Sequence, residues 1–512
     1  MPSLTARTDR HTIIDRRPGR YLSFPDVALT TSGKLVVVYR EADQHVAEDA
    51  SKLLVRRSAD SGRTWSRPET LHAAHGHCPR LRRLPDGELI VIDDATHALY
   101  RSHGNKRFTM TPYAGPEIPL PDRLLILGPD RWLTAGHSHR GRVAHPTTRQ
   151  PTSEELTYLS TDQGQSFFAL SIMAYDPFLV LCEASMLALP DGRILALLRE
   201  NSFVYEPMYA VVSEDDGETW TLPRPTPLIG HRPTLGLTAS GRLLVTYRNV
   251  GPDPGTAAWM GDLDDLLSDF ATAGRIPSPS EVSLTEAGLV IDNPDGKNHG
   301  ARFALRPLTY PERAIATLTA TVRVDAAEKQ ACGIRFGGAW WRLYPDRLEV
   351  GDHAPEPYAT GVFHDIDLSY KRGTVTLSID GARRARIRVD ARDANTRPIL
   401  FGTPSISEEN AGRHCWQTVS LATTEPRYER RYRWRWHFRD GLPDAYSRAH
   451  VLELDNDRHA SLGDFGYSGW TELPDGRYYC AYHHGGGDED DYAVGTSSHI
   501  RGVWFTDDDF NA

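Results

Sequence analysis

An eight-residue repeat constrains the fold of this 512-residue chain more than any other feature. Residues 58–65, 160–167 and 213–220 share the pattern Ser-x-Asp-x-Gly-x-Ser/Thr-aromatic. In such a hairpin turn the Asp side chain accepts hydrogen bonds from the turn backbone, and Gly takes the positive φ that other residues avoid. The aromatic side chain then packs beneath the strands. The repeat therefore predicts a β protein built from similar hairpins.

A second repeat accompanies the first and consists of a strand, a Gly-containing turn and an apolar strand. It recurs at 25–40, 79–94, 183–199, 232–248 and 467–483, with a weaker copy at 123–137. Apolar and other residues alternate with a period of two, as in strands. Six such units, spaced by roughly 40–50 residues except for one longer interval, predict a six-bladed β-propeller.

The interval between the fifth and sixth copies is too long for a loop. Residues 277–425 lack the repeat but contain short alternating strands, which predicts an inserted β-sandwich of the jelly-roll kind. The expected fold is all-β, with this sandwich between blades 5 and 6. We expect blades 1–5 in residues 1–276, the sandwich in 277–425, and blade 6 with ring closure in 426–512. The early strand 12–15 is expected to close the ring.

Composition excludes several classes of function. The chain has 58 Lys and Arg against 68 Asp and Glu, a formal net charge of -10, so nucleic acid is not an expected partner. No stretch approaches the ~20 apolar residues of a membrane helix. The N-terminal residues lack the apolar core of a signal peptide, so we expect a cytoplasmic protein. Five cysteines without a CxxC pair predict neither disulfides nor structural zinc. The oligomeric state stays open.

Polar residues recur where the innermost strand of each predicted blade begins and where the next strand ends. In a propeller these positions meet at one mouth of the central channel. Converging arginines would clamp an anion such as a carboxylate, sulfate or phosphate on a sugar. The candidate binding residues are Asp26, Arg80, Glu183, Arg232 and Tyr467 at strand starts, Arg40, Asp93 or Asp94, His137, Arg199, Arg248 and His483 at strand ends, and His77 nearby.

The eight-residue repeats resemble the Asp boxes of sialidases (neuraminidases), and the resemblance covers residues 12 to about 275 and 426–508. The segment 277–425 resembles the concanavalin-like (laminin-G-like) sandwiches that sialidases often carry. The resemblance implies a retaining exo-glycosidase that hydrolyses a glycoside of sialic acid or a related carboxylated sugar, without a cofactor.

Two segments carry the resemblance into the active site. Glu183-Ala-Ser, followed by Asp191-Gly-Arg and Arg199, and Gly466-Tyr467-Ser468, followed by Asp475-Gly476, are similar to family segments. They imply Tyr467 as the nucleophile and Glu183 as its base. The resemblance further implies Arg199 and Arg248 as arginines of a carboxylate clamp, which we expect Arg232 to join. It places the acid on the loop after the first blade's second strand, where Asp43 and Asp49 are the candidates.

One family motif differs. Sialidases place the first clamp arginine in an Arg-Ile-Pro triplet, and the matching triplet here is Ser23-Phe24-Pro25. Arg20, Arg80 or Arg232 could complete a rearranged clamp, and a different acidic sugar is an equal alternative. Two other functions stay open: a lyase that cleaves uronate-containing glycans by β-elimination, and a carbohydrate-binding propeller without turnover. His137-x-His139 and His483-His484 show no third ligand, so no metal site is predicted.

Overall fold

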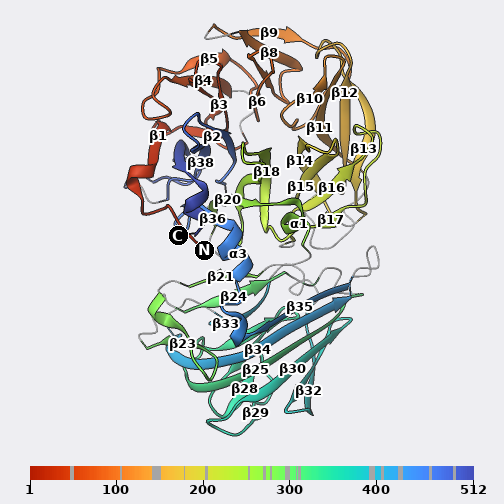
Figure 1. The fold of residues 1–512 in the computed structure, drawn as a ribbon. Coiled ribbons are helices and arrows are strands. Elements are labelled where there is room, and N and C mark those ends of the chain that lie inside the picture. Colours follow the sequence, from red (N-terminus) through yellow and green to blue (C-terminus); the bar gives the residue numbers. More distant parts are fainter. Residues whose placement is uncertain are drawn as a thin grey trace.

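The computed structural model describes residues 1–511 except 47–50, 104–105, 141–150, 178, 202–205, 252–253, 269–271, 277–278, 295–299, 307, 309–312, 391–397, 405–408, 425–430, 461–463, 488–489 and 491. In this part of the chain, six four-stranded sheets form a ring, and two larger sheets form a second body below it (Figure 1). The predicted all-β, six-bladed propeller is confirmed.

The first four blades each use four consecutive strands, and the first strands of most neighbouring blades contact one another around the channel. Blade 1 contains β2 (Tyr21–Leu29), β3 (Leu35–Ala42), β4 (Lys52–Ser58) and β5 (Glu69–His72). Blade 2 contains β6 (Arg80–Arg83), β7 (Glu88–Ile92), β8 (Ala98–His103) and β9 (Thr109–Pro112). Blade 3 contains β10 (Leu125–Gly128), β11 (Arg131–His139), β12 (Ser153–Ser160) and β13 (Phe168–Tyr175). Blade 4 contains β14 (Leu181–Ala188), β15 (Ile194–Glu200), β16 (Tyr209–Ser213) and β17 (Arg224–Pro225).

The last two blades take strands from distant parts of the chain. Blade 5 contains β18 (Gly230–Leu237), β19 (Leu243–Asn249), β20 (Gly255–Gly261) and β36 (Val451–Asn456). Blade 6 contains β37 (Ser468–Glu472), β38 (Tyr478–His484), β39 (His499–Phe505) and the N-terminal β1 (His11–Asp15). β1 pairs antiparallel with β39, and this pairing closes the ring.

The insertion interrupts blade 5 and does not follow it. β36, the fourth strand of that blade, pairs antiparallel with β20 and lies after the whole inserted segment. Our prediction of an insertion between blades 5 and 6 therefore misses the insertion point by one strand. The segment 451–456 carries neither the turn motif nor a Gly-containing hairpin, so nothing in its sequence marks it as part of a blade.

The second body is made of two facing sheets. One contains, in order, β21 (Ala273–Arg275), β24 (Arg302–Leu305), β33 (Ile399–Gly402), β26 (Gly333–Phe336), β27 (Ala339–Leu343), β28 (Arg347–Glu349) and β29 (Glu356–Pro357). The other contains β22 (Val282–Leu284), β23 (Leu289–Asn293), β34 (Gly412–Thr424), β25 (Ile315–Ala327), β30 (His364–Lys371), β31 (Thr374–Ile379) and β32 (Ala382–Arg388). β35 (Arg431–His437) also pairs with β34, so this body extends past residue 425.

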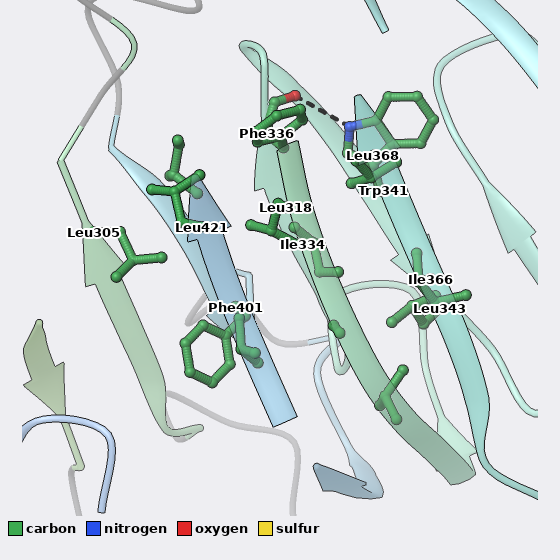
Figure 2. Packing of buried hydrophobic residues seen from close by; sticks show 14 of the residues in the cluster. Leu305, Leu318, Ile334, Phe336, Trp341, Leu343, Ile366, Leu368, Phe401 and Leu421 are labelled. Carbon is green, nitrogen blue, oxygen red and sulfur yellow. Dashed lines mark hydrogen bonds between the residues drawn. The ribbon is translucent and has the colours of Figure 1, made fainter. Parts of the chain in front are cut away.

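Both sheets contribute apolar side chains to one core (Figure 2). Leu318 and Ile366 come from one sheet, and Ile334 and Phe401 come from the other. Along β25 buried residues alternate with more exposed ones, which is the pattern of a strand with one face in a core. Trp341 is fully buried, and its indole nitrogen donates to the Phe336 carbonyl oxygen at 3.1 Å. The arrangement is that of a β-sandwich, and its concanavalin-like character stays a prediction.

Helices are short in the described part of the chain. They are the α-helices α1 (Leu263–Leu266) and α3 (Ala445–His450), and the 3₁₀ turns η1 (Thr8–Arg10), η2 (Pro279–Glu281), η4 (Phe438–Asp440) and η5 (Asp507–Asn511). None of the helices that the structure describes is long and apolar enough to cross a membrane.

The three copies of the repeated turn adopt one hydrogen-bonding pattern. In the first copy the Asp60 carboxylate accepts from the Thr64 backbone N–H at 2.9 Å, from the Thr64 hydroxyl at 2.6 Å and from the Ser58 hydroxyl at 2.7 Å. Asp162 and Asp215 accept the same three kinds of bond. The turn glycines have φ of 83° to 94°, which glycine adopts without strain.

Candidate active site

Six equivalent residues, one before or within each innermost strand, meet at one end of the channel. They are Phe24, Cys78, Leu120, Glu183, Arg232 and Tyr467. Four of them have φ between 48° and 54°. In blades 1, 4 and 5 the pairing register with the second strand shifts at this residue. Such a β-bulge turns a side chain away from the regular strand direction, and it occurs here at Phe24, Glu183 and Arg232.

The ring of six has an apolar half and a polar half. Phe24, Cys78 and Tyr467 pack in one cluster, with Leu120 against it. Arg232 extends across the channel, and its Nη2 lies 3.3 Å from the Cys78 sulfur and 3.3 Å from the Pro121 carbonyl oxygen. Blades 1–3 thus supply apolar side chains, and blades 4–6 supply a carboxylate, a guanidinium and a phenol.

Arg199, at the end of β15, connects the carboxylate and the phenol. Its Nη1 donates to both oxygens of Glu183, at 2.7 and 2.9 Å, and lies 2.9 Å from the Tyr467 hydroxyl oxygen. Its Nη2 donates to Asn201 at 2.8 Å. Glu183, Arg199 and Tyr467 are 6–8% exposed. Because so little water reaches them, their charges interact more strongly than at a surface.

This environment moves two pKa values in opposite directions. Burial alone would raise the pKa of Glu183, but Arg199 and Arg232 outweigh it and hold that pKa at about 2. Burial raises the pKa of Tyr467, and the nearby charges of Arg199 and Arg248 reduce this rise. At neutral pH the free site therefore contains a carboxylate, a neutral phenol and charged guanidinium groups.

Arg248 completes the positively charged side of the site. Its guanidinium carbon lies 5.0 Å from the centroid of the Tyr467 ring, a cation–π distance. Its Nη2 is 2.6 Å from the Nδ1 of His231. Arg199, Arg232 and Arg248 thus surround Tyr467 and Glu183, so the three predicted clamp arginines do come together. Three guanidinium groups against the Glu183 carboxylate favour an anionic ligand.

Asp26 and Arg80, which were predicted to bind substrate, are buried and do not line this site. Each lies two residues further along its strand, deeper in the channel. The Asp26 carboxylate accepts from Arg123 Nε at 2.9 Å and from the Leu81 backbone N–H at 2.8 Å, and it is fully buried. Arg80 lies 3.7 Å from Asp26 and donates to Asp122 at 3.4 Å. These four side chains fill the axis below the ring of six.

The triplet Ser23-Phe24-Pro25 contains no arginine, and Arg20 does not take such a place in the ring. Ser23 is fully buried, and its Cα partner across the sheet is Arg40. Arg20 instead forms ion pairs with Glu41 at 3.2 Å and with Asp43. Arg40 lies near the apolar half of the ring, with its guanidinium carbon 5.9 Å from the Phe24 ring centroid.

A pocket of about 460 Å³ opens beside Phe24, between blades 1 and 2. Arg40, His45, His77 and Asp94 are among its lining residues. His77 Nδ1 lies 2.8 Å from Asp94, and although burial lowers the pKa of His77, the hydrogen bond to Asp94 raises it overall. The neighbouring Asp93 is fully buried, and burial raises its pKa to about 7. Arg40 and His77 thus face a cavity that adjoins the apolar half of the ring at Phe24.

His137 and His483 lie near the ring as buried imidazoles. Burial lowers the pKa of each to about 4, so both are neutral at pH 7. Both ring nitrogens of His483 lack a hydrogen-bond partner among the described residues. His137 Nδ1 is 4.0 Å from the fully buried Glu155, and burial raises the pKa of that carboxyl to about 8.

The structure describes only one of the two candidates for the acid. Asp43 pairs with Arg20, and its side chain is 57% exposed. Asp49 lies outside the described residues. No repeat motif points to Asp464 or Glu155, although both lie in this region, Asp464 beside His45 and Glu155 beside His137. Among the residues that the structure describes, no group of three or more His, Cys, Asp and Glu side chains could hold a metal ion.

Comparison with known proteins agrees with the propeller. Residues 7–253 match the family model described as a BNR repeat-like domain. The matched segment covers β1, blades 1–4 and the first two strands of blade 5 of the propeller. No curated protein matches the chain.

Solved structures with similar folds have low sequence identity to this chain. A Dyadobacter fermentans protein of unknown function is 13% identical, with a TM-score of 0.49 and 97% of each chain covered. Trypanosoma rangeli sialidase, solved with 2,3-difluoro-KDN, is 11% identical, with a TM-score of 0.36, covering 82% of this chain and 96% of that chain. A xylan β-1,4-xylosidase from Bacillus halodurans is 11% identical, with a TM-score of 0.33, covering 81% and 100%.

Proposed function

We propose that this protein is a retaining exo-glycosidase of the sialidase type that hydrolyses a glycoside of a carboxylated sugar. One observation carries the proposal: Arg199 Nη1 lies within hydrogen-bond distance of both the Glu183 carboxylate and the Tyr467 hydroxyl. A nucleophile, its base and a cation thus share one buried contact, which is the arrangement that activates a weak nucleophile.

The charges of the site support an acidic sugar. Arg199, Arg232 and Arg248 face Glu183, so a substrate carboxylate would complete the balance of charge. A neutral phenol can approach an anomeric carbon next to that carboxylate, whereas a carboxylate nucleophile would be repelled. The sugar itself stays open between sialic acid and a related acid.

Two displacements would complete the reaction. In the first, Tyr467 gives its proton to Glu183, its oxygen bonds to the anomeric carbon, and the leaving oxygen departs with a proton from an acid. In the second, water attacks the anomeric carbon and loses a proton to the same group, while Tyr467 leaves and recovers its proton from Glu183. Two inversions give net retention.

The low pKa of Glu183 belongs to the free site. A substrate carboxylate bound by Arg199 and Arg232 would neutralise the charges that hold this pKa at about 2. Glu183 would then become a stronger base only when substrate is present. The phenolate that develops on Tyr467 would be stabilised by Arg199 and Arg248, which already lower its pKa against burial.

The test is a screen of aryl glycosides of N-acetylneuraminic acid and glucuronic acid, together with uronate-containing oligosaccharides. We expect release of the aryl alcohol with retained anomeric configuration, seen by NMR. Tyr467→Phe should lower kcat by about 10³-fold or more. Tyr175→Phe, an exposed tyrosine on the outer strand β13, is the matched control and should keep full activity. Full activity in Tyr467→Phe would refute the mechanism.

Glu183→Gln separates an enzyme from a binding protein. Loss of turnover with retained ligand binding, measured by calorimetry with the free sugar acid, is the expected result. Equal binding by both proteins without turnover by the wild type would favour a carbohydrate-binding propeller.

A polysaccharide lyase that acts on uronates by β-elimination is the second candidate. The neutral imidazoles of His137 and His483 favour it, because an uncharged histidine can abstract a proton. An unsaturated product in the same screen, detected by its ultraviolet absorbance, would establish the lyase and reassign Tyr467 to proton transfer.

A further inference from the structure

A histidine–carboxylate pair lies beside Tyr467. His45 follows β3 on the loop where the sequence predicts the acid, and its Nδ1 lies 2.7 Å from Asp464 Oδ2. The Tyr21 hydroxyl donates to the same Asp464 oxygen and lies 2.9 Å from His45 Nδ1. The two paired residues are 419 positions apart in the sequence.

The hydrogen bonds assign the proton on His45. Burial would raise the pKa of Asp464, but its bonds to His45 and Tyr21 and the nearby His483 keep that pKa well below its usual range. An ionised carboxylate only accepts, so His45 Nδ1 carries the hydrogen that it donates. The side chain of His45 is 48% exposed, and among the described residues nothing hydrogen-bonds to its Nε2. Nε2 is therefore the atom that can exchange a proton with a ligand.

The position of the ring suits the leaving group. The Phe24 ring centroid is 5.7 Å from that of His45 and 4.8 Å from that of Tyr467, both edge-to-face. His45 also lines the 460 Å³ pocket, together with Arg40 and His77. Asp464 lies only three residues before Tyr467, so one segment positions both the nucleophile and the carboxylate that orients His45.

We propose that His45 is the acid and base of the reaction, that Asp464 is its positioning residue, and that the pocket holds the leaving group. This inference rests on the proposed hydrolysis. In the first step His45 Nε2 gives its proton to the glycosidic oxygen as the carbon–oxygen bond breaks, and the imidazole becomes neutral. In the second step neutral His45 takes the proton of the attacking water and regains its charge.

The test compares leaving groups. General acid catalysis contributes about 10²–10⁴-fold to poor leaving groups and little to good ones. For His45→Ala we expect kcat/KM on methyl glycosides of the two sugar acids to fall by about 10²-fold or more. On 4-nitrophenyl glycosides the same parameter should fall by less than about tenfold. Free imidazole should restore part of the lost activity, and His103→Gln, at an exposed histidine on β8, is the matched control.

Asp464→Asn tests the positioning role. It should lower kcat with little change in KM and show the same dependence on the leaving group, which a merely structural change would not produce. Asp464→Glu, which keeps the charge, should recover part of the activity. Circular dichroism confirms that each variant is folded.

The outcomes separate the two proposals. In one outcome Tyr467→Phe loses activity on both kinds of glycoside, and His45→Ala loses activity equally on both. This outcome would overturn the assignment of His45 and leave the proposed hydrolysis intact. The assignment of His45 would also be overturned if the loss of kcat/KM depended on the leaving group in Asp43→Asn and not in His45→Ala. No hydrolysis by the wild-type protein would overturn both.

Discussion

Asp26→Asn measures whether the network below the ring of six stabilises the fold or binds substrate. The Asp26 carboxylate accepts from Arg123 and from two backbone N–H groups, and Arg80 lies 3.7 Å away. Removing its charge leaves buried guanidinium groups uncompensated, and losing one partner of a buried ion pair costs about 3–5 kcal/mol. We expect a loss of this size in the free energy of unfolding, measured with guanidinium chloride at pH 7.

The ion pairs of Asp26 also predict how this loss of stability depends on pH. Burial would raise the pKa of Asp26, but Arg123 and Arg80 lower it below its ordinary value. The carboxylate therefore stabilises the fold above the unfolded pKa of about 4, and this stability disappears as the pH falls through the folded pKa. The difference between wild type and Asp26→Asn should shrink accordingly in acid.

A surface ion pair supplies the control. The Asp191 carboxylate accepts hydrogen bonds from Arg193 at the surface, where its side chain is 51% exposed. Asp191→Asn should leave the free energy of unfolding almost unchanged, because solvent screens an exposed ion pair. If Asp26→Asn were as mild as this control but weakened substrate binding, our structural reasoning would be refuted, and Asp26 would regain its predicted binding role.

Two further predictions concern other carboxyl groups. Burial raises the pKa of Glu155 to about 8, so from pH 5 to 8 the unfolded chain binds fewer protons than the folded one. The free energy of unfolding should therefore fall as the pH rises. Glu155→Gln should remove this pH dependence in unfolding titrations. Asp60→Ala deletes three hydrogen bonds in an exposed turn and should cost about 1–2 kcal/mol. The equivalent changes at Asp162 and Asp215 should also lower the free energy of unfolding in denaturant titrations. No measurable effect at Asp60 would show that the turn repeat is not a stabilising device.

The sequence predicts the propeller because turn and strand signals repeat six times, and it predicts half of the ring of six for the same reason. Glu183, Arg232 and Tyr467 were identified by their distance from a turn glycine. In blades 1 and 2 the prediction chose Asp26 and Arg80 over Phe24 and Cys78. Residues two apart share one face of a strand. Periodicity therefore does not distinguish a residue at the mouth of the channel from one in its interior. Because we favoured charged residues as candidates, the prediction selected the deeper pair.

The pairing of His45 with Asp464 was beyond the reach of sequence patterns. The two residues come from loops of different blades, and neither loop carries a repeat. Their contact depends on ring closure, which brings blade 6 next to blade 1. The pKa values of Glu155 and Glu183 also depend on tertiary contacts. Arg232 lowers both, but only Glu183 also bonds to Arg199, which helps to hold its pKa at about 2.

The split of blade 5 has a consequence for synthesis on the ribosome. β20 is complete once residue 261 has emerged, but its outer partner β36 begins only at Val451. Until then a nascent or truncated chain presents β20 as an open strand edge, which is a template for pairing with another chain. The sandwich is therefore synthesised, and can fold, while the exposed edge of β20 can still pair with another chain. Premature termination anywhere in the inserted segment should yield aggregates and not a five-bladed remnant.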